Sequence, residues 1–462
     1  MREAQLAEQN ATREKIGHSL GRNLTTASTS AGGTASRFST REKAHASSPL
    51  TSQLSGLRSK SSYSSDFSTS SSAYGNFSSG PSSGVRTYSS SARRGSGTID
   101  RERAKASYSS FSSAGEPTRR KACVGLSNLG NTCFMNSILQ CLFGVGELAD
   151  FFNDDAAAAS AIRDKDSRVA RAFHDLVKKA LRSEFGSVVS PGAFHEKVKL
   201  KDRKWGGMRQ HDSQEFLQFL LNVLREQCNR IREKKPKYKE LDEKGTQQEQ
   251  ASQALKYYKS WHDSIIDDIF GGLLESSITC DLCNHISYCF DPFLDLSLPV
   301  PGSAGDSVRL QDCLSKFTEK ENLEDLATGY KCEKCKKSGG GACKKLTIYK
   351  APRVLILHLK RFSGNGGGFS RFSRFSKNSA RVSFAKELDF GEFCFTGNWN
   401  DAKYRLFAIS HHTGSLSGGH YYAEVEDSTT SAWHNFNDSM VSSCRQPETA
   451  SSTAYVLFYR RL

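Results

Sequence analysis

An abrupt change in composition near Lys121 constrains this chain more than any other feature. Before it the sequence is of low complexity, and 14 of the 30 residues from 61 to 90 are Ser. A segment of this kind has too few apolar side chains to offset the entropy that ordering would cost. We therefore expect a disordered, Ser-rich basic tail over residues 1–120 and one folded domain over residues 121–462, where apolar residues become frequent and patterned.

The net charge of +15 is concentrated in this tail, which holds 17 Lys and Arg against 8 Asp and Glu. Solvated tail charge accounts for the excess, with contact to an acidic membrane or partner as the alternative, so we expect no nucleic-acid partner. No stretch reaches the roughly 18 apolar residues of a membrane span, and the chain opens with polar residues rather than a signal peptide. The 13 cysteines are an odd number. We expect a reducing intracellular compartment, cytoplasmic, nuclear or both.

Apolar periodicity along the folded part predicts helices first and strands later. Helical spacing follows Thr132, a candidate N-cap, and recurs over Val169–Arg182 and Gln214–Arg232. From Ile278 onward the pattern alternates, for example over Val354–Leu359. The order indicates an α+β domain with a largely antiparallel sheet.

The segment Asn128–Ser137 reads as a Gly-bearing turn that runs directly into an apolar helix, with Cys133 in the first turn. Unpaired N–H groups and the positive end of the helix dipole favour the thiolate there. The same N–H groups can stabilise an oxyanion, and the Asn128 side chain offers a further donor. We predict that Cys133 is a nucleophile.

A thiol nucleophile needs a base, and the base needs a third group that fixes its ring. Two glycines stand directly before His420, and an alternating strand follows it. The segment Trp433–Ser439 resembles a returning hairpin strand that could hold Asn437 or Asp438 beside the imidazole. We predict that His420 is the base, and either residue can serve as its partner.

These two segments resemble the Cys box and His box of the ubiquitin-specific protease family, which are papain-like cysteine deubiquitinases. Gln210–Phe216 is similar to the Q-x-D-A-x-E-F signature of the family, with Ser213 in place of Ala, and Leu357–Phe362 is similar to its L-x-L-K-R-F strand. The resemblance covers residues 123–462. It implies a hand-like fold with a thumb (about 123–262), fingers (about 263–350) and a palm (mostly 351–462).

The resemblance also implies roles for individual residues. Asn437 matches the third catalytic residue, Asp438 its acidic neighbour and Asn128 the oxyanion-hole side chain. A further group is expected to contact ubiquitin or its Gly-Gly tail, with the two glycines leaving room for that tail. This group consists of Asp212, Glu215, Gly418, Gly419 and Tyr421.

Two C-x-x-C pairs predict a metal site. Cys280 and Cys283 form one pair, Cys332 and Cys335 the other. Each pair can supply two thiolates from one turn, and together they complete a tetrahedral site with no open position. We expect a structural Zn²⁺ that braces the fingers.

The expected activity is therefore hydrolysis of the isopeptide bond after the terminal glycine of ubiquitin, on protein conjugates or polyubiquitin chains, by a monomeric enzyme. The alternatives are a protease for another ubiquitin-like modifier and a ubiquitin-binding scaffold with weak activity. Neither the substrate proteins nor the preferred chain linkage follows from the sequence.

Overall fold

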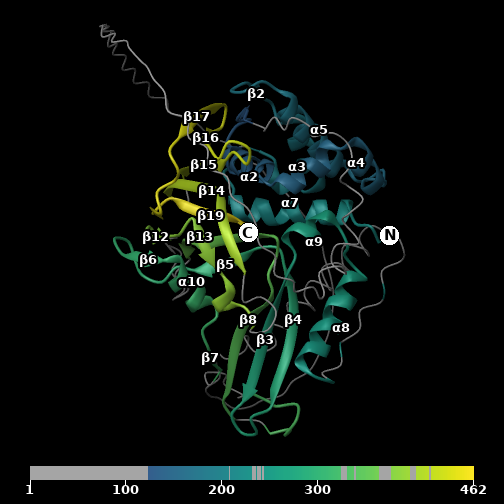
Figure 1. Cartoon of the computed structure of the whole chain (residues 1–462), viewed down its shortest axis with the longest axis vertical. Coiled ribbons are helices and arrows are strands. Elements are labelled where there is room, and N and C mark those ends of the chain that lie inside the picture. Colours follow the sequence, from purple (N-terminus) through teal and green to yellow (C-terminus); the bar gives the residue numbers. More distant parts are fainter. Residues whose placement is uncertain are drawn as a thin grey trace, which may run out of the picture. The chain divides into compact units, whose positions relative to one another are not determined.

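The computed structural model describes residues 123–207, 209–231, 236, 241, 244–323, 330–337, 340–363, 376–395, 402–415 and 418–462. The predicted disordered tail lies outside these residues. The described helices precede most of the strands in the chain, as the periodicity predicts (Figure 1). They are α2 (Cys133–Phe143), α3 (Gly146–Asn153), α4 (Asp155–Ala161), α5 (Arg168–Arg182), α6 (Gly192–Lys201), α7 (Ser213–Gln227), α8 (Gln247–Lys259), α9 (Ile265–Phe270) and α10 (Leu310–Phe317), with 3-10 turns at Arg203–Trp205 and Gly391–Phe393.

An eight-stranded sheet runs in the order β17-β16-β15-β14-β19-β9-β5, with β13 paired to β14. Neighbouring strands are antiparallel except β5 and β9. Its strands are β5 (Leu296–Pro299), β9 (Val354–Lys360), β13 (Glu387–Asp389), β14 (Lys403–Ser415), β15 (Gly418–Glu426), β16 (Trp433–Asn437), β17 (Met440–Cys444) and β19 (Ala454–Arg461).

A second, four-stranded antiparallel sheet has the order β4-β3-β8-β7, and α8 runs alongside it (Figure 1). Its strands are β3 (Gly272–Cys280), β4 (Ile286–Phe293), β7 (Glu321–Asn322) and β8 (Ala342–Lys350). The remaining strands are short and form small sheets, β1-β2, β10-β11 and β18-β12-β6. They are β1 (Gly125–Leu126), β2 (Val188–Val189), β6 (Ser307–Arg309), β10 (Phe362–Ser363), β11 (Ser376–Lys377), β12 (Arg381–Ser383) and β18 (Ala450–Ser451).

Burial explains how these elements pack. Every residue of α2 is buried, because the helix lies between β14 and β15 on one side and α3 and α7 on the other. Two large cores form, one of which holds α2, α5, α7 and part of the sheet. The small cluster beneath α8 contains only Ala251, Leu273 and Tyr349 as buried apolar residues, so the four-stranded sheet has little core of its own.

The predicted α+β fold is confirmed. One helix is shorter than the periodicity suggested: α7 ends at Gln227, whereas the pattern ran to Arg232. The side chain of Asn229 stops it, since its Oδ1 accepts from the backbone N–H of Ile231 and Asp263, and its Nδ2 donates to the Trp261 carbonyl. No helix among the described residues is long and apolar enough to cross a membrane.

Candidate active site and metal centre

The turn before α2 is wound around one side chain. Oδ1 of Asn128 accepts hydrogen bonds from the backbone N–H of Gly130 (3.0 Å) and Thr132 (3.1 Å). Gly130 and Asn131 both have positive φ, 95° and 56°, a conformation that Gly and Asn tolerate best. Thr132 is the N-cap residue, yet its side chain does not cap α2; its Oγ1 accepts from the Leu129 N–H instead. The turn thus delivers Cys133 as the first residue of α2.

Cys133 is only 3% exposed. Burial raises the pKa of its thiol, and the nearby Asp438 carboxylate adds to the increase. Hydrogen bonds from the backbone of Tyr421, Phe134 and Cys133 itself oppose this effect without overcoming it. The expectation that the helix start alone would favour the thiolate therefore fails in the free protein, because desolvation outweighs the helix N-terminus. A neighbouring base has to remove the proton.

The Tyr421 contact brings β15 against the thiol, since α2 packs on this strand, and the predicted base, His420, is the residue before Tyr421. Nε2 of His420 lies 2.6 Å from Oδ1 of Asn437. An amide oxygen only accepts, so Nε2 carries the proton and Nδ1 keeps the lone pair.

The hydrogen bonds distinguish Asn437 from Asp438 as the partner of the His420 ring. Asp438 turns away from the imidazole: one carboxylate oxygen accepts from Nδ2 of Asn128 (2.9 Å), and the other from Nδ2 of Asn136 (2.8 Å). Its φ of +49° produces this change of direction. Asp438 therefore ties the β16–β17 turn to both the Asn128 turn and α2.

This contact also orients Asn128. Because its Oδ1 is held by two backbone donors, the amide NH₂ must face Asp438, and one of its two N–H bonds remains for another acceptor. That is the donor an oxyanion beside Cys133 would need.

Gln210 is a site residue that sequence reasoning missed. Its side-chain amide makes two hydrogen bonds with the backbone of Gly419: Nε2 donates to the carbonyl (2.8 Å), and Oε1 accepts from the N–H (3.0 Å). The pair fixes the residue directly before His420. Gln210 is the first residue of the Gln210–Phe216 motif, and this was the only available signal.

The two glycines differ in what surrounds them. A Cβ on Gly418 would meet no atom of the described residues within 4 Å, whereas one on Gly419 would overlap the ring of His412. Gly419 is thus required by packing within the chain itself. At Gly418 the open space is compatible with the predicted passage of a peptide tail.

The predicted substrate-contacting carboxylates already have partners. Asp212 caps α7 by accepting from the Gln214 N–H, and its other oxygen accepts from the Tyr455 hydroxyl (2.5 Å); burial raises its pKa. Glu215 is exposed and pairs with Lys204. Tyr421 is only 6% exposed, and its backbone makes a hydrogen bond with Cys133.

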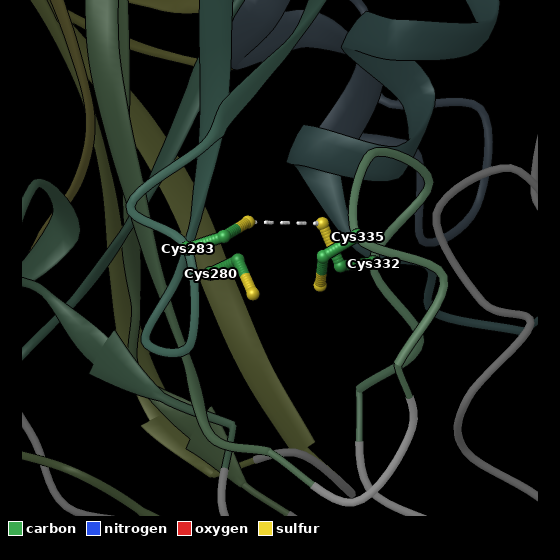
Figure 2. A group of neighbouring side chains, drawn as sticks. All are labelled: Cys280, Cys283, Cys332 and Cys335. Carbon is green, nitrogen blue, oxygen red and sulfur yellow. Dashed lines mark hydrogen bonds between the residues drawn. The ribbon is translucent and has the colours of Figure 1, made fainter.

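The four predicted metal ligands converge at the end of the four-stranded sheet, and all four sulfur atoms lie within 4.8 Å of one another (Figure 2). The two turns have the same hydrogen bonds. The N–H of Asn284 donates to the Cys280 carbonyl, and the N–H of Lys336 donates to that of Cys332. Asn284 and Lys336 also share a positive φ, 54° and 57°.

These residues fit a tetrahedral ion. With Zn–S bonds of about 2.3 Å, tetrahedral geometry requires sulfur atoms about 3.8 Å apart. The sulfur atoms of Cys283 and Cys332, which come from different turns, are 3.7 Å apart. Four thiols that converge in this way could hold a metal ion, and a set of four cysteines with no open position is typical of structural zinc sites.

Comparison with known proteins agrees with this arrangement. The model of the family "Ubiquitin carboxyl-terminal hydrolase" matches residues 124–459. Human ubiquitin carboxyl-terminal hydrolase 2 is 39% identical over 339 residues, which cover 72% of this chain and 54% of the relative. The Gallus gallus protein of that name is 38% identical over 351 residues, and the match covers 96% of that protein's length. The chain thus spans about half the length of the human relative.

Among solved structures, the SAGA Ubp8/Sgf11/Sus1/Sgf73 DUB module bound to ubiquitin aldehyde contains a similar chain. It superposes with a TM-score of 0.58 at 29% identity, covering 78% of this chain and 74% of that one. The family model and the relatives together confirm the resemblance seen in the motifs: this chain belongs to the ubiquitin carboxyl-terminal hydrolase family.

Proposed function

We propose that this chain is a thiol-dependent deubiquitinase that hydrolyses the isopeptide bond after the C-terminal glycine of ubiquitin. The observation that carries the proposal is the position of His420 in β15. Asn437 holds its ring, Gln210 holds the preceding residue, Gly419, and the backbone of the following residue, Tyr421, contacts Cys133. Family membership and a neighbour solved with ubiquitin aldehyde support ubiquitin as the substrate.

In the proposed reaction, Nδ1 of His420 takes the proton from the Cys133 thiol, and the thiolate attacks the carbonyl carbon of the terminal glycine. The imidazolium then gives that proton to the leaving lysine amine as the C–N bond breaks, which leaves a thioester on Cys133. Water, deprotonated by the same imidazole, hydrolyses the thioester and releases ubiquitin. Asn437 holds Nε2 through both steps.

The negative charge on the attacked oxygen needs donors. The backbone N–H of Cys133 at the start of α2 and the second N–H of Asn128 are the candidates. The contact between Asp438 and Asn128 supports the same role, because it aims the amide. Asp438 is then a positioning residue for Asn128, and Asn437 is the residue that orients the base.

Substrate contacts follow from the same geometry. The ubiquitin tail is proposed to pass the open side of Gly418, next to the Gln210–Gly419 pair. Glu215 is exposed and can exchange Lys204 for a basic substrate group, whereas Asp212 contributes by fixing the start of α7.

We further propose that Cys280, Cys283, Cys332 and Cys335 hold Zn²⁺. When bound, the ion would serve as a structural cross-link and take no part in hydrolysis. The four-stranded sheet needs such a cross-link because it has little core of its own.

Location and assembly remain proposals as well. All thirteen cysteines lie in the described part of the chain and none forms a disulfide, which supports a reducing compartment, cytoplasmic or nuclear. We propose a monomer that acts on ubiquitin conjugates. Imaging of the tagged protein and light scattering after gel filtration test these two points.

The test of the activity is hydrolysis of a fluorogenic ubiquitin C-terminal amide. Wild-type protein should release the fluorophore, and Cys133→Ala should not. Probes built on other ubiquitin-like modifiers provide the comparison. A Cys133→Ala variant that retains activity, or a preference for another modifier, would contradict the proposal.

A further inference from the structure

An unusual concentration of exposed apolar side chains borders the proposed active site. Nine large apolar residues of the described chain are exposed. Four of them lie in three short segments near Cys133, rather than being scattered as single exposed residues usually are. They are Leu129 (37% exposed), Phe185 (65%), Val188 (52%) and Met440 (69%).

Backbone pairing joins the segments. β1 lies between β2 and the β16–β17 turn: Gly125 is in register with Val188, and the Leu126 N–H donates to the Asp438 carbonyl (2.8 Å). A Cβ on Gly125 would overlap the Ser439 backbone. Val188 and Met440 are therefore on two strands that lie on either side of β1.

Phe185 and Leu129 extend this surface in two directions. The Phe185 ring lies 5.6 Å from the His434 ring on β16, and His434 is paired with Ser443 of β17. Leu129 follows Asn128, whose side chain is bonded to Asp438. In Figure 1, β2, β16 and β17 accordingly lie at the same end of the domain as α2.

The segments that carry these side chains hold little charge, and Glu184 and Asp438 lie at their borders. Neither 123–134, nor 185–192, nor 439–444 contains an Asp, Glu, Lys or Arg residue, although these four types make up 24% of the chain. Uncharged, apolar surface is the character of an interface core. It does not suit an acidic or a basic ligand.

The strand order decides which part of a substrate meets this surface. His420 is on β15, between β14 and β16. Gly418 and Gly419 pair with β14, where the ubiquitin tail is proposed to pass, whereas Met440 lies beyond β16 on the opposite edge. The amine of the modified lysine leaves the carbonyl carbon attacked by Cys133, and we infer that its protein lies toward the edge that carries Met440.

We propose that Leu129, Phe185, Val188 and Met440 form a leaving-group face, which binds an apolar patch of the folded protein that carries the modified lysine. This inference rests on the proposed function. It assigns a binding surface to the protein that carries the modified lysine, which the catalytic residues do not contact. Selection among conjugates and among ubiquitin chain linkages would then arise here.

The test compares two substrates of one enzyme. Val188→Asp, Met440→Asp and the double variant place charge on the face, while Leu200→Asp, an exposed apolar residue on α6 (66% exposed), is the matched control. The substrates are a fluorogenic ubiquitin amide, which lacks a protein leaving group, and a panel of di-ubiquitins in which the second ubiquitin is the leaving protein.

We expect kcat/KM for at least one di-ubiquitin to fall about tenfold in the double variant, with the fluorogenic substrate changed less than about twofold and Leu200→Asp unchanged on both. Equal losses on both substrates would overturn the face, because the substitutions would then act on the catalytic residues. Unchanged cleavage of every di-ubiquitin would overturn it too. Wild-type protein that is inactive on the fluorogenic amide would instead contradict the proposed function, and the face with it.

Discussion

The two adjacent glycines before His420 permit a sharp prediction, because the structure assigns them different neighbours. Alanine at Gly419 puts a methyl group into the His412 ring, 2.8 Å from its Cε1, and 2.7 Å from the Thr413 carbonyl oxygen. His412 is 3% exposed and packs on Phe362 and Tyr421, so it cannot move away cheaply.

Overpacking of this kind costs about 1–3 kcal/mol of unfolding free energy. In a domain of this size each kcal/mol lowers Tm by about 2–4 °C, so Gly419→Ala should lower Tm by about 2–12 °C. It should also reduce kcat, because the displaced residue precedes His420. Gly418→Ala is the matched control: its Cβ has no atom of the residues that the structure describes within 4 Å, so the substitution should leave Tm unchanged or slightly higher.

The two variants are compared by differential scanning fluorimetry and by hydrolysis of a fluorogenic ubiquitin amide. If the ubiquitin tail passes Gly418, Gly418→Ala should raise KM for this substrate at unchanged Tm. Equal Tm values for the two variants would refute the packing argument. A lowered Tm for Gly418→Ala alone would show that the surroundings of the glycines are assigned the wrong way round.

Three further predictions follow from the site and its surroundings. Asn437→Ala removes the acceptor of the His420 N–H and should lower kcat at least about tenfold at unchanged Tm; steady-state kinetics showing wild-type kcat would exclude the orienting role. Cys335→Ser should leave the protein with less than about half an equivalent of zinc by metal analysis and with a lower Tm, whereas wild-type protein that contains no zinc as purified would contradict the four-thiolate site. Burial lowers the pKa of His358 to about 3 and of His412 to about 4. As pH drops below about 6.5 the unfolded chain therefore takes up protons first, and the free energy of unfolding should fall by on the order of 2 kcal/mol per histidine at pH 5. Urea unfolding at pH 7.5 and pH 5 measures this, and equal stabilities at the two pH values, or the same pH dependence in His358→Gln, would count against it.

Short-range patterns in the sequence were sufficient to predict the main helices and strands and the candidate nucleophile, base and metal ligands. A Gly-bearing turn before an apolar helix indicated the position of Cys133, and alternation after His420 indicated β15. The paired C-x-x-C spacing anticipated a cluster whose sulfur atoms do lie within 4.8 Å. The turn, the alternation and each single C-x-x-C pair are all patterns of consecutive residues, and only the pairing of the two C-x-x-C elements joins separate segments.

The parts that the sequence could not supply depend on contacts between distant segments. Asn128 and Asp438 are 310 positions apart, and Gln210 and Gly419 are 209 apart. Nothing local distinguishes Asn437 from its neighbour; the positive φ of Asp438 separates their directions.

The protonation of the nucleophile shows the same limit. A helix start predicts a lowered thiol pKa, but packing of β15 over α2 buries Cys133, and the cost of desolvating the thiolate is larger. The exposed apolar surface around β1, β2 and β17 could not be predicted from the sequence either, since its side chains come from three separate segments.

The central claim is that one of thirteen cysteines is the nucleophile, and covalent trapping tests it most directly. Full-length protein is incubated with ubiquitin bearing an electrophile at its C-terminus, and the adduct is digested and mapped by mass spectrometry. The account predicts a single adduct on the peptide that contains Cys133 and none in Cys133→Ala. An adduct on any other cysteine, or one that persists in Cys133→Ala, would contradict it.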